Sequence, residues 1–265
     1  MRHLILSVML VMLFCGGVSA AQFGTPVAAT EGFGDFSITA GYSRLSSTWG
    51  EDSIHFEGID IDHHVYYLQG TMGLAQGWDI YLRSGASSLS TDDIYVISGV
   101  KTSDEEFENG PNLFASIGFN GWVYQGEIFS FGLFGQASYF DTFEDTAKGT
   151  GTSRSSTTGP WTMDRATASF DEMWMVDVGI AAQAKIEGVD LYCGPLFYYG
   201  RTEVKSFVYG SSVLRGVAYE PELEENGNIG LLIGARWPFK NNYSLDVEFQ
   251  KRSNFNTSLA LTYTF

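Results

Sequence analysis

The chain has 265 residues, a formal net charge of -16, 15% aromatic residues and 31 glycines. Binding to a nucleic-acid backbone needs clustered Lys and Arg, so this acidic composition excludes nucleic acid as a predicted partner. After the first twenty residues, no segment has the long uncharged apolar run of a transmembrane helix.

The N-terminal residues have the pattern of a secretory signal peptide. A short basic head, Met1–His3, precedes an apolar run from Leu4 to Phe14, and Val18–Ala20 supplies small residues before a cleavage point. We therefore predict a mature chain that begins at Ala21 and in which Cys193 has no disulfide partner. The predicted organisation is a cleaved signal peptide over 1–20, a short periplasmic lead over 21–34 and one β-domain over 35–265.

From residue 36 onward, apolar and small or polar residues alternate in short segments. A period of two residues is typical of a β-strand with one apolar face. The alternation predicts about ten strands, over 36–42, 66–74, 78–82, 113–119, 129–139, 174–184, 189–197, 231–237, 243–249 and 257–265. A partial alternation over 204–219 is interpreted as the extension of two strands, and twelve strands are the alternative.

The connections between these strands mostly alternate between short and long. Tight turns such as Glu187-Gly188 are followed by long acidic or Gly/Ser/Thr-rich connections. This rhythm is typical of an antiparallel up-and-down transmembrane barrel with short periplasmic turns and long outer loops. A secreted β-sandwich is the rival architecture, and aromatics near the strand ends, such as Trp78 and Trp237, favour the barrel.

The last predicted strand carries Leu259, Leu261, Tyr263 and Phe265 on one face. This ending resembles the C-terminal signature of Gram-negative outer-membrane β-barrels, and the predicted architecture resembles that of the small OmpA/OmpX-like barrels. The resemblance implies an outer-membrane location, contact with membrane lipid and lipopolysaccharide, and recognition of Tyr263 and Phe265 by the barrel assembly machinery.

The predicted inner face combines large side chains with charges of both signs. Isolated buried charges are costly, so a closed lumen requires them to pair; the alternative is a narrow water path that selects ions. The predicted lumen charge network comprises Asp79, Arg83, Asp177, Lys185, Arg236, Asp246 and Glu248.

The candidates for a reactive or metal site are Asp62, His63 and His64, because carboxylates beside imidazoles can bind a metal or activate water. Omptin proteases have a histidine on a late strand, whereas no histidine follows His64 here, so that mechanism is not carried over. An exposed loop edge is the preferred interpretation of this cluster. No cofactor motif is present in the sequence.

The sequence therefore predicts a non-enzymatic, largely closed barrel that displays acidic loops and acts in envelope integrity or surface interaction. Divalent cations are a further expected partner of the loop acids. A narrow channel for small solutes or ions is the first alternative, and a rim-located hydrolase is the second. The loop acids expected to attract divalent cations occur in three runs, Glu51-Asp52, Asp104–Glu108 and Glu220–Glu225.

Overall fold

The computed structural model describes residues 32–50, 58–91, 96–97, 100–101, 106–148, 152–155, 159–210, 217–240 and 242–265. The predicted signal peptide and most of the predicted periplasmic lead lie outside these residues. The strands among them are β1 (Phe36–Gly50), β2 (Ile59–Ala75), β3 (Trp78–Thr91), β4 (Val96–Ile97), β5 (Val100–Lys101), β6 (Phe107–Gln125), β7 (Phe129–Phe140), β8 (Phe143–Lys148), β9 (Thr152–Ser155), β10 (Gly159–Ile186), β11 (Val189–Gly210), β12 (Val217–Tyr219), β13 (Glu222–Glu225), β14 (Ile229–Phe239), β15 (Tyr243–Lys251) and β16 (Phe255–Thr264). In this part of the chain, no helix has the length and apolar character needed to cross a membrane.

Ten of these strands form a closed antiparallel barrel. Their order around the wall is β1-β2-β3-β6-β7-β10-β11-β14-β15-β16, and β16 pairs with β1 to complete the ring. The closing pairs run from Ser37↔Thr264 to Arg44↔Thr257. The predicted count of ten wall strands is confirmed, and the twelve-strand alternative and the sandwich are not supported.

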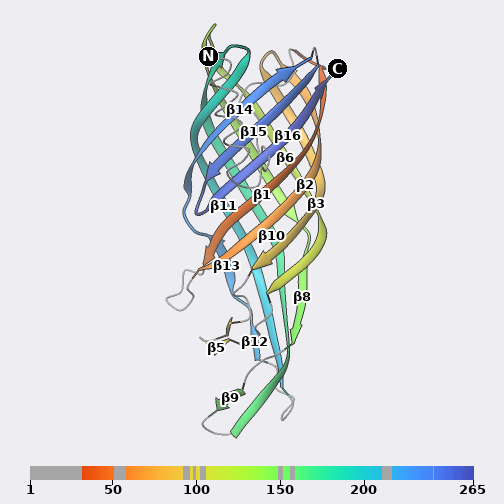
Figure 1. Cartoon of the computed structure of the whole chain (residues 1–265), viewed down its shortest axis with the longest axis vertical. Coiled ribbons are helices and arrows are strands. Elements are labelled where there is room, and N and C mark those ends of the chain that lie inside the picture. Colours follow the sequence, from red (N-terminus) through yellow and green to blue (C-terminus); the bar gives the residue numbers. More distant parts are fainter. Residues whose placement is uncertain are drawn as a thin grey trace.

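The two ends of the barrel differ in their connections. Short turns join β2 to β3, β6 to β7, β10 to β11 and β14 to β15 at one end, which we call the short-turn end. Phe265 donates its backbone N–H to the carbonyl of Phe36, so the start of β1 and the chain terminus lie together there, at the top of Figure 1. The start of β10 and the end of β11 extend far beyond the barrel at the opposite, long-connection end, together with β8, β9 and β12 (Figure 1).

The polarity of the wall inverts along the strands. In β1 the outward residues near the short-turn end are apolar, as at Ile38, whereas Arg44 further along points outward. In β2, Leu68 is 65% exposed and outward, while the more distant Ile61 is buried in the interior. An exposed apolar exterior is stable only against lipid, so the apolar band marks the membrane-spanning part. Its exposed members include Ile38, Tyr66, Leu68, Met72, Leu82, Leu113, Ile117, Phe131, Val178, Ile180, Leu191, Phe197, Leu231, Ile233 and Leu261.

Interior aromatic rings lie across glycines on neighbouring strands. A Cβ added to Gly118 of β6 would fall 2.2 Å from the Tyr81 ring of β3, so only glycine lets this ring lie against the wall. The same close approach joins Gly41 to Tyr67 and Gly234 to Tyr192. Part of the high glycine content therefore makes room for large side chains inside a narrow barrel.

Candidate functional site in the barrel interior

The interior near the long-connection end is filled by apolar side chains. They form one buried cluster contributed by β1, β2, β3, β6, β7, β8, β10, β11 and β13: Leu45, Trp49, Ile59, Ile61, Val65, Tyr67, Leu89, Phe107, Phe114, Phe140, Phe143, Ala147, Ala166, Ala168, Phe170, Met173, Met175, Val204 and Leu223. Outside the apolar band, the strands therefore enclose a core like that of a water-soluble protein, with polar residues turned outward. We call these residues the apolar plug.

His63 lies inside the apolar plug. Its ring makes edge contacts with Phe140 and Phe143, at centroid distances of 5.3 and 5.6 Å. Its Nδ1 lies 3.5 Å from Ser87 Oγ, and Nε2 has no hydrogen-bond partner among the described residues. Burial disfavours the imidazolium and lowers the pKa of His63 to about 3, so the ring is neutral.

The membrane-spanning interior contains a bonded polar network beside a second buried cluster, which comprises Phe134, Ala181, Tyr192, Leu196, Tyr198 and Leu232. Arg236 of β14 contacts Asp246 of β15, with Nε 2.7 Å from Oδ1. Glu248 accepts hydrogen bonds from the Tyr192 hydroxyl at 3.0 Å and from Gln250 Nε2 at 2.6 Å. Paired carboxylates and satisfied acceptors make burial of these groups tolerable.

The Arg83 guanidinium is bound by the side chain of Gln69 and lies near two tyrosine rings. Its Nε and Nη2 donate to Gln69 Oε1 at 3.1 and 2.7 Å. The guanidinium also lies over the Tyr67 ring, 4.0 Å from the centroid, and faces the Tyr81 ring at 5.5 Å. The cation is therefore accommodated by an amide oxygen and aromatic faces at the level where the polar interior meets the apolar plug.

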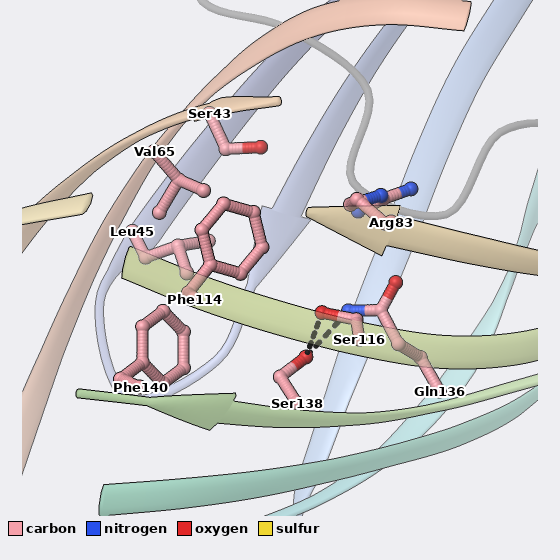
Figure 2. Close-up of a pocket in the computed structure, with 9 residues that line it drawn as sticks. All are labelled: Ser43, Leu45, Val65, Arg83, Phe114, Ser116, Gln136, Ser138 and Phe140. Atoms are coloured by element: carbon pink, nitrogen blue, oxygen red, sulfur yellow. Dashed lines mark hydrogen bonds between the residues drawn. The ribbon is translucent and has the colours of Figure 1, made fainter. Parts of the chain in front are cut away.

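A small cavity lies at this boundary. Figure 2 shows apolar side chains on one side of it and Arg83 with Ser116, Gln136 and Ser138 on the other. Ser138 Oγ accepts hydrogen bonds from Ser116 Oγ at 2.8 Å and Gln136 Nε2 at 2.9 Å. The volume of about 10 Å³ is near the space needed for one water molecule. This cavity has no room for an organic ligand.

The most deeply buried charges form a triad that spans the lumen. Arg252, in the turn between β15 and β16, has Nη1 3.0 Å from Asp177 Oδ1 of β10 and Nη2 2.6 Å from Glu225 Oε2 of β13. The side chains of all three residues are 0% exposed in these pairs. The Arg252 guanidinium also lies 4.4 Å from the centroid of the Tyr198 ring. One guanidinium therefore contacts two carboxyl groups away from water.

The sequence prediction found part of this arrangement. Asp79, Arg83, Asp177, Asp246 and Glu248 are buried, and Arg236 is paired with Asp246. Lys185 is exposed and its register partner is Asp190 near the short-turn end, away from the triad. The missed residues are Arg252, which was assigned to a connection, and Glu225, which was assigned to an acidic loop. Arg252 continues the two-residue period of Asp246, Glu248 and Gln250. This alternation could have predicted that its side chain points into the barrel.

The predicted cluster Asp62, His63 and His64 does not converge on one point. Asp62 points outward and accepts a hydrogen bond from Arg44 Nη2 at 3.0 Å. His64 also points outward, with Nδ1 2.6 Å from the Tyr42 hydroxyl, whereas His63 is inside the plug. In the described residues, no group of three or more His, Cys, Asp or Glu side chains is arranged to hold a metal ion.

A closed antiparallel barrel with an apolar exterior band satisfies its backbone groups within a bilayer. The chain therefore has the fold of a small outer-membrane β-barrel. No family model matches the sequence, and no curated protein matches it. Similar solved structures include the outer membrane protease OmpT from Escherichia coli, with 12% identity, a TM-score of 0.46 and coverage of 88% of this chain and 96% of that chain.

The translocator domain of the autotransporter NalP from Neisseria meningitidis has 9% identity and a TM-score of 0.45, covering 87% of this chain and 88% of that chain. The Pseudomonas putida toluene transporter TodX has 12% identity and a TM-score of 0.41, covering 94% of this chain and 78% of that chain. Their activities belong to those proteins, and no residue role is transferred from them.

Proposed function

We propose that this protein is a non-enzymatic outer-membrane barrel that is closed in its resting state and presents an acidic surface outside the cell. The observation that carries the proposal is the filled interior. The apolar plug occupies the section beyond the membrane, and the Arg252 triad, itself inaccessible to water, lies beneath β13. A lumen filled in this way has no route for solutes, in keeping with a barrel of about ten strands.

The proposed orientation places the short-turn end in the periplasm and the long-connection end outside the cell. The exterior beyond the apolar band carries exposed acids, including Asp60, Glu106, Glu108, Glu144, Glu220 and Glu222. A surface of this charge attracts divalent cations, which also bridge the phosphates of lipopolysaccharide. Envelope integrity or surface interaction is therefore the proposed role, with lipopolysaccharide and divalent cations as partners.

Two measurements test this proposal. The folded mature protein in a planar bilayer at about pH 5 is expected to be silent, and regular conductance steps there would contradict a closed resting state. In cells, a variant with Glu106, Glu108, Glu144 and Glu222 changed to Gln is expected to lose resistance to detergent or chelator. The matched control changes acids at the short-turn end, Glu127 and Glu187, to Gln. Equal resistance of the two variants would contradict the surface role.

A further inference from the structure

The barrel wall between β1 and β11 is incomplete near the long-connection end. The pairing of β16 with β1 stops at Arg44↔Thr257, and the pairing of β14 with β11 stops at Phe197↔Ile229. Beyond these points β13 takes the place of the missing strands. It makes only two register pairs with β1, at Trp49 and Gly50, and three with β11, from Arg201 to Glu203.

The rest of this part of the wall is held by single backbone hydrogen bonds on either side of β13 and by side chains of the β15–β16 turn. Asn226 donates its backbone N–H to the Thr48 carbonyl at 2.8 Å, and Val204 donates to the Pro221 carbonyl at 2.9 Å. Ser253 Oγ accepts the backbone N–H of Thr48 at 2.9 Å, and Asn254 Nδ2 donates to Thr48 Oγ1 at 3.1 Å. A four-residue strand, single flanking backbone bonds and a few side-chain bonds are a weaker closure than the continuous ladders elsewhere in the barrel. Such short segments are the ones that open at low free-energy cost.

Toward the interior, β13 places Leu223 in the apolar plug and Glu225 against Arg252, with Glu225 Oε2 2.6 Å from Arg252 Nη2. Asp177 holds the other side of the same guanidinium, and Asp177 belongs to β10, which is paired on both sides. Arg252 therefore connects a movable wall element to a fixed one. Tyr198 of β11 and Trp49 of β1 complete the surroundings of this contact.

Beneath β13, a polar surface continues through the membrane-spanning part. We call it the polar wall: the inward, buried polar residues of β15, β16 and β1, which are Asp246, Glu248, Gln250, Asn256, Ser258, Thr262, Ser37, Thr39, Ser43 and Ser47. Gln250 Oε1, Asn256 Nδ2 and Ser37 Oγ have no hydrogen-bond partner among the described residues. Buried polar groups of this kind are normally satisfied by water, so the polar wall is suited to a file of water and ions.

We propose that β13 is a latch over the outer end of a cation path along the polar wall, and that the contact between Glu225 and Arg252 holds this latch closed. The inference rests on the closed resting state proposed above and adds a gated activity to it. Cations are favoured because Asp246 and Glu248 of the polar wall, with Asp177 and Glu225 at its outer end, outnumber Arg236 and Arg252.

Opening of the latch is expected to depend on pH. The titratable groups that face Glu225 are Arg252, Asp177 and Tyr198. Burial raises the pKa of Glu225 to about 7; Arg252 opposes this effect and Asp177 adds to it. The closed latch thus retains a proton that an open, hydrated Glu225 loses near its ordinary value of 4.5. The closed state is favoured most below that value, and the preference is lost as the pH rises toward about 7.

The test is single-channel recording of the mature protein in planar bilayers of diphytanoylphosphatidylcholine with KCl on both sides. We expect silence at about pH 5 and K⁺-selective openings at about pH 8, with at least a tenfold rise in open probability. Glu225→Gln keeps the hydrogen-bonding shape without the charge and is expected to remain closed at both values. Glu220→Gln, at an exposed position just before β13, is the matched control and is expected to behave as the wild type.

A disulfide across β1 and β13 provides a second test. Gly50 and Glu224 are register partners, so Gly50→Cys with Glu224→Cys in a Cys193→Ser background is expected to lock the latch. The oxidised protein should be silent at both pH values, and a reductant should restore the openings at about pH 8.

Silence of the folded wild type at both pH values would overturn the latch and leave the closed-barrel proposal intact. Openings at about pH 8 that persist in the oxidised lock would also overturn it, because the path would then lie elsewhere. Conductance at about pH 5 that the lock does not reduce would instead overturn the closed resting state itself. Folding of each variant is checked by its heat-modifiable migration on a gel.

Discussion

Arg252 Nη1 lies 3.0 Å from Asp177 Oδ1, across the lumen from the strand turn that carries it. The contact joins β10 to the β15–β16 turn, and Glu225 extends it to β13. Three segments that are distant in sequence are therefore fixed to one another inside the barrel by one guanidinium.

Removal of this guanidinium is expected to destabilise the barrel strongly. Arg252→Met leaves Asp177 and Glu225 buried without their cation, and loss of one partner from a buried pair costs about 3–5 kcal/mol. Urea unfolding of the refolded protein in detergent micelles measures the change. Lys251→Met, at an exposed neighbouring position, is the control and should change the free energy of unfolding by less than about 0.5 kcal/mol.

Neutralising the entire triad is expected to cost less than removing Arg252 alone. The variant Asp177→Asn, Glu225→Gln, Arg252→Met leaves no uncompensated charge in the interior. The same urea experiment should place its stability above that of the single Arg252 variant. A triple variant less stable than the single one would show that net charge is not the dominant cost at this site.

The contact between Gly118 and the Tyr81 ring predicts a steric effect. Gly118→Val would place Cβ 2.2 Å from the ring, so the ring must move within a filled lumen and the expected cost is about 1–3 kcal/mol. Gly110→Val is the matched control on the same strand, because an added Cβ at Gly110 meets no atom within 4 Å. Equal unfolding midpoints for the two variants would contradict the proposed fit.

His63 predicts a loss of stability in acid. Its pKa is lowered from 6.5 to about 3 in the folded state, so the unfolded chain takes up a proton below about pH 6.5 while the folded chain does not. The penalty grows as the pH falls through this range and reaches about 2 kcal/mol near pH 5. Urea unfolding at several pH values measures the free energy of unfolding as a function of pH, and His63→Leu should remove this part of its decrease in acid. His64→Leu, on the exterior, should retain it.

Cys193 provides a direct test of the apolar band. Its side chain is exposed on the exterior of β11, between Leu191 and Phe197 on the same face. In lipid vesicles, a lipid-soluble maleimide is therefore expected to label it, and a charged, membrane-impermeant maleimide is not. A Glu108→Cys variant in a Cys193→Ser background, beyond the band, should show labelling by the charged reagent. Rapid labelling of Cys193 by the charged reagent in vesicles would contradict a lipid-facing position.

Much of the wall was predictable, because lipid-facing strands need an apolar residue at every second position. The ten segments found by alternation correspond to the ten wall strands, but several were predicted too short. In β2, alternation indicated a start near Tyr66, whereas the strand begins at Ile59. Beyond the band, the apolar residues move to the inner face and the pattern changes phase. The sequence signal for a lipid-facing strand then disappears although the strand continues.

The sequence by itself determined the barrel class, the number of wall strands and the face of each strand that meets lipid, because these depend on periodicity along one segment. Only the tertiary structure decided which charges meet. Asp177 and Arg252 are separated by most of the later strands, and Glu225 was indistinguishable from its acidic neighbours in sequence. Pairing across a lumen depends on barrel closure and register, which bring distant segments together and which no local pattern records.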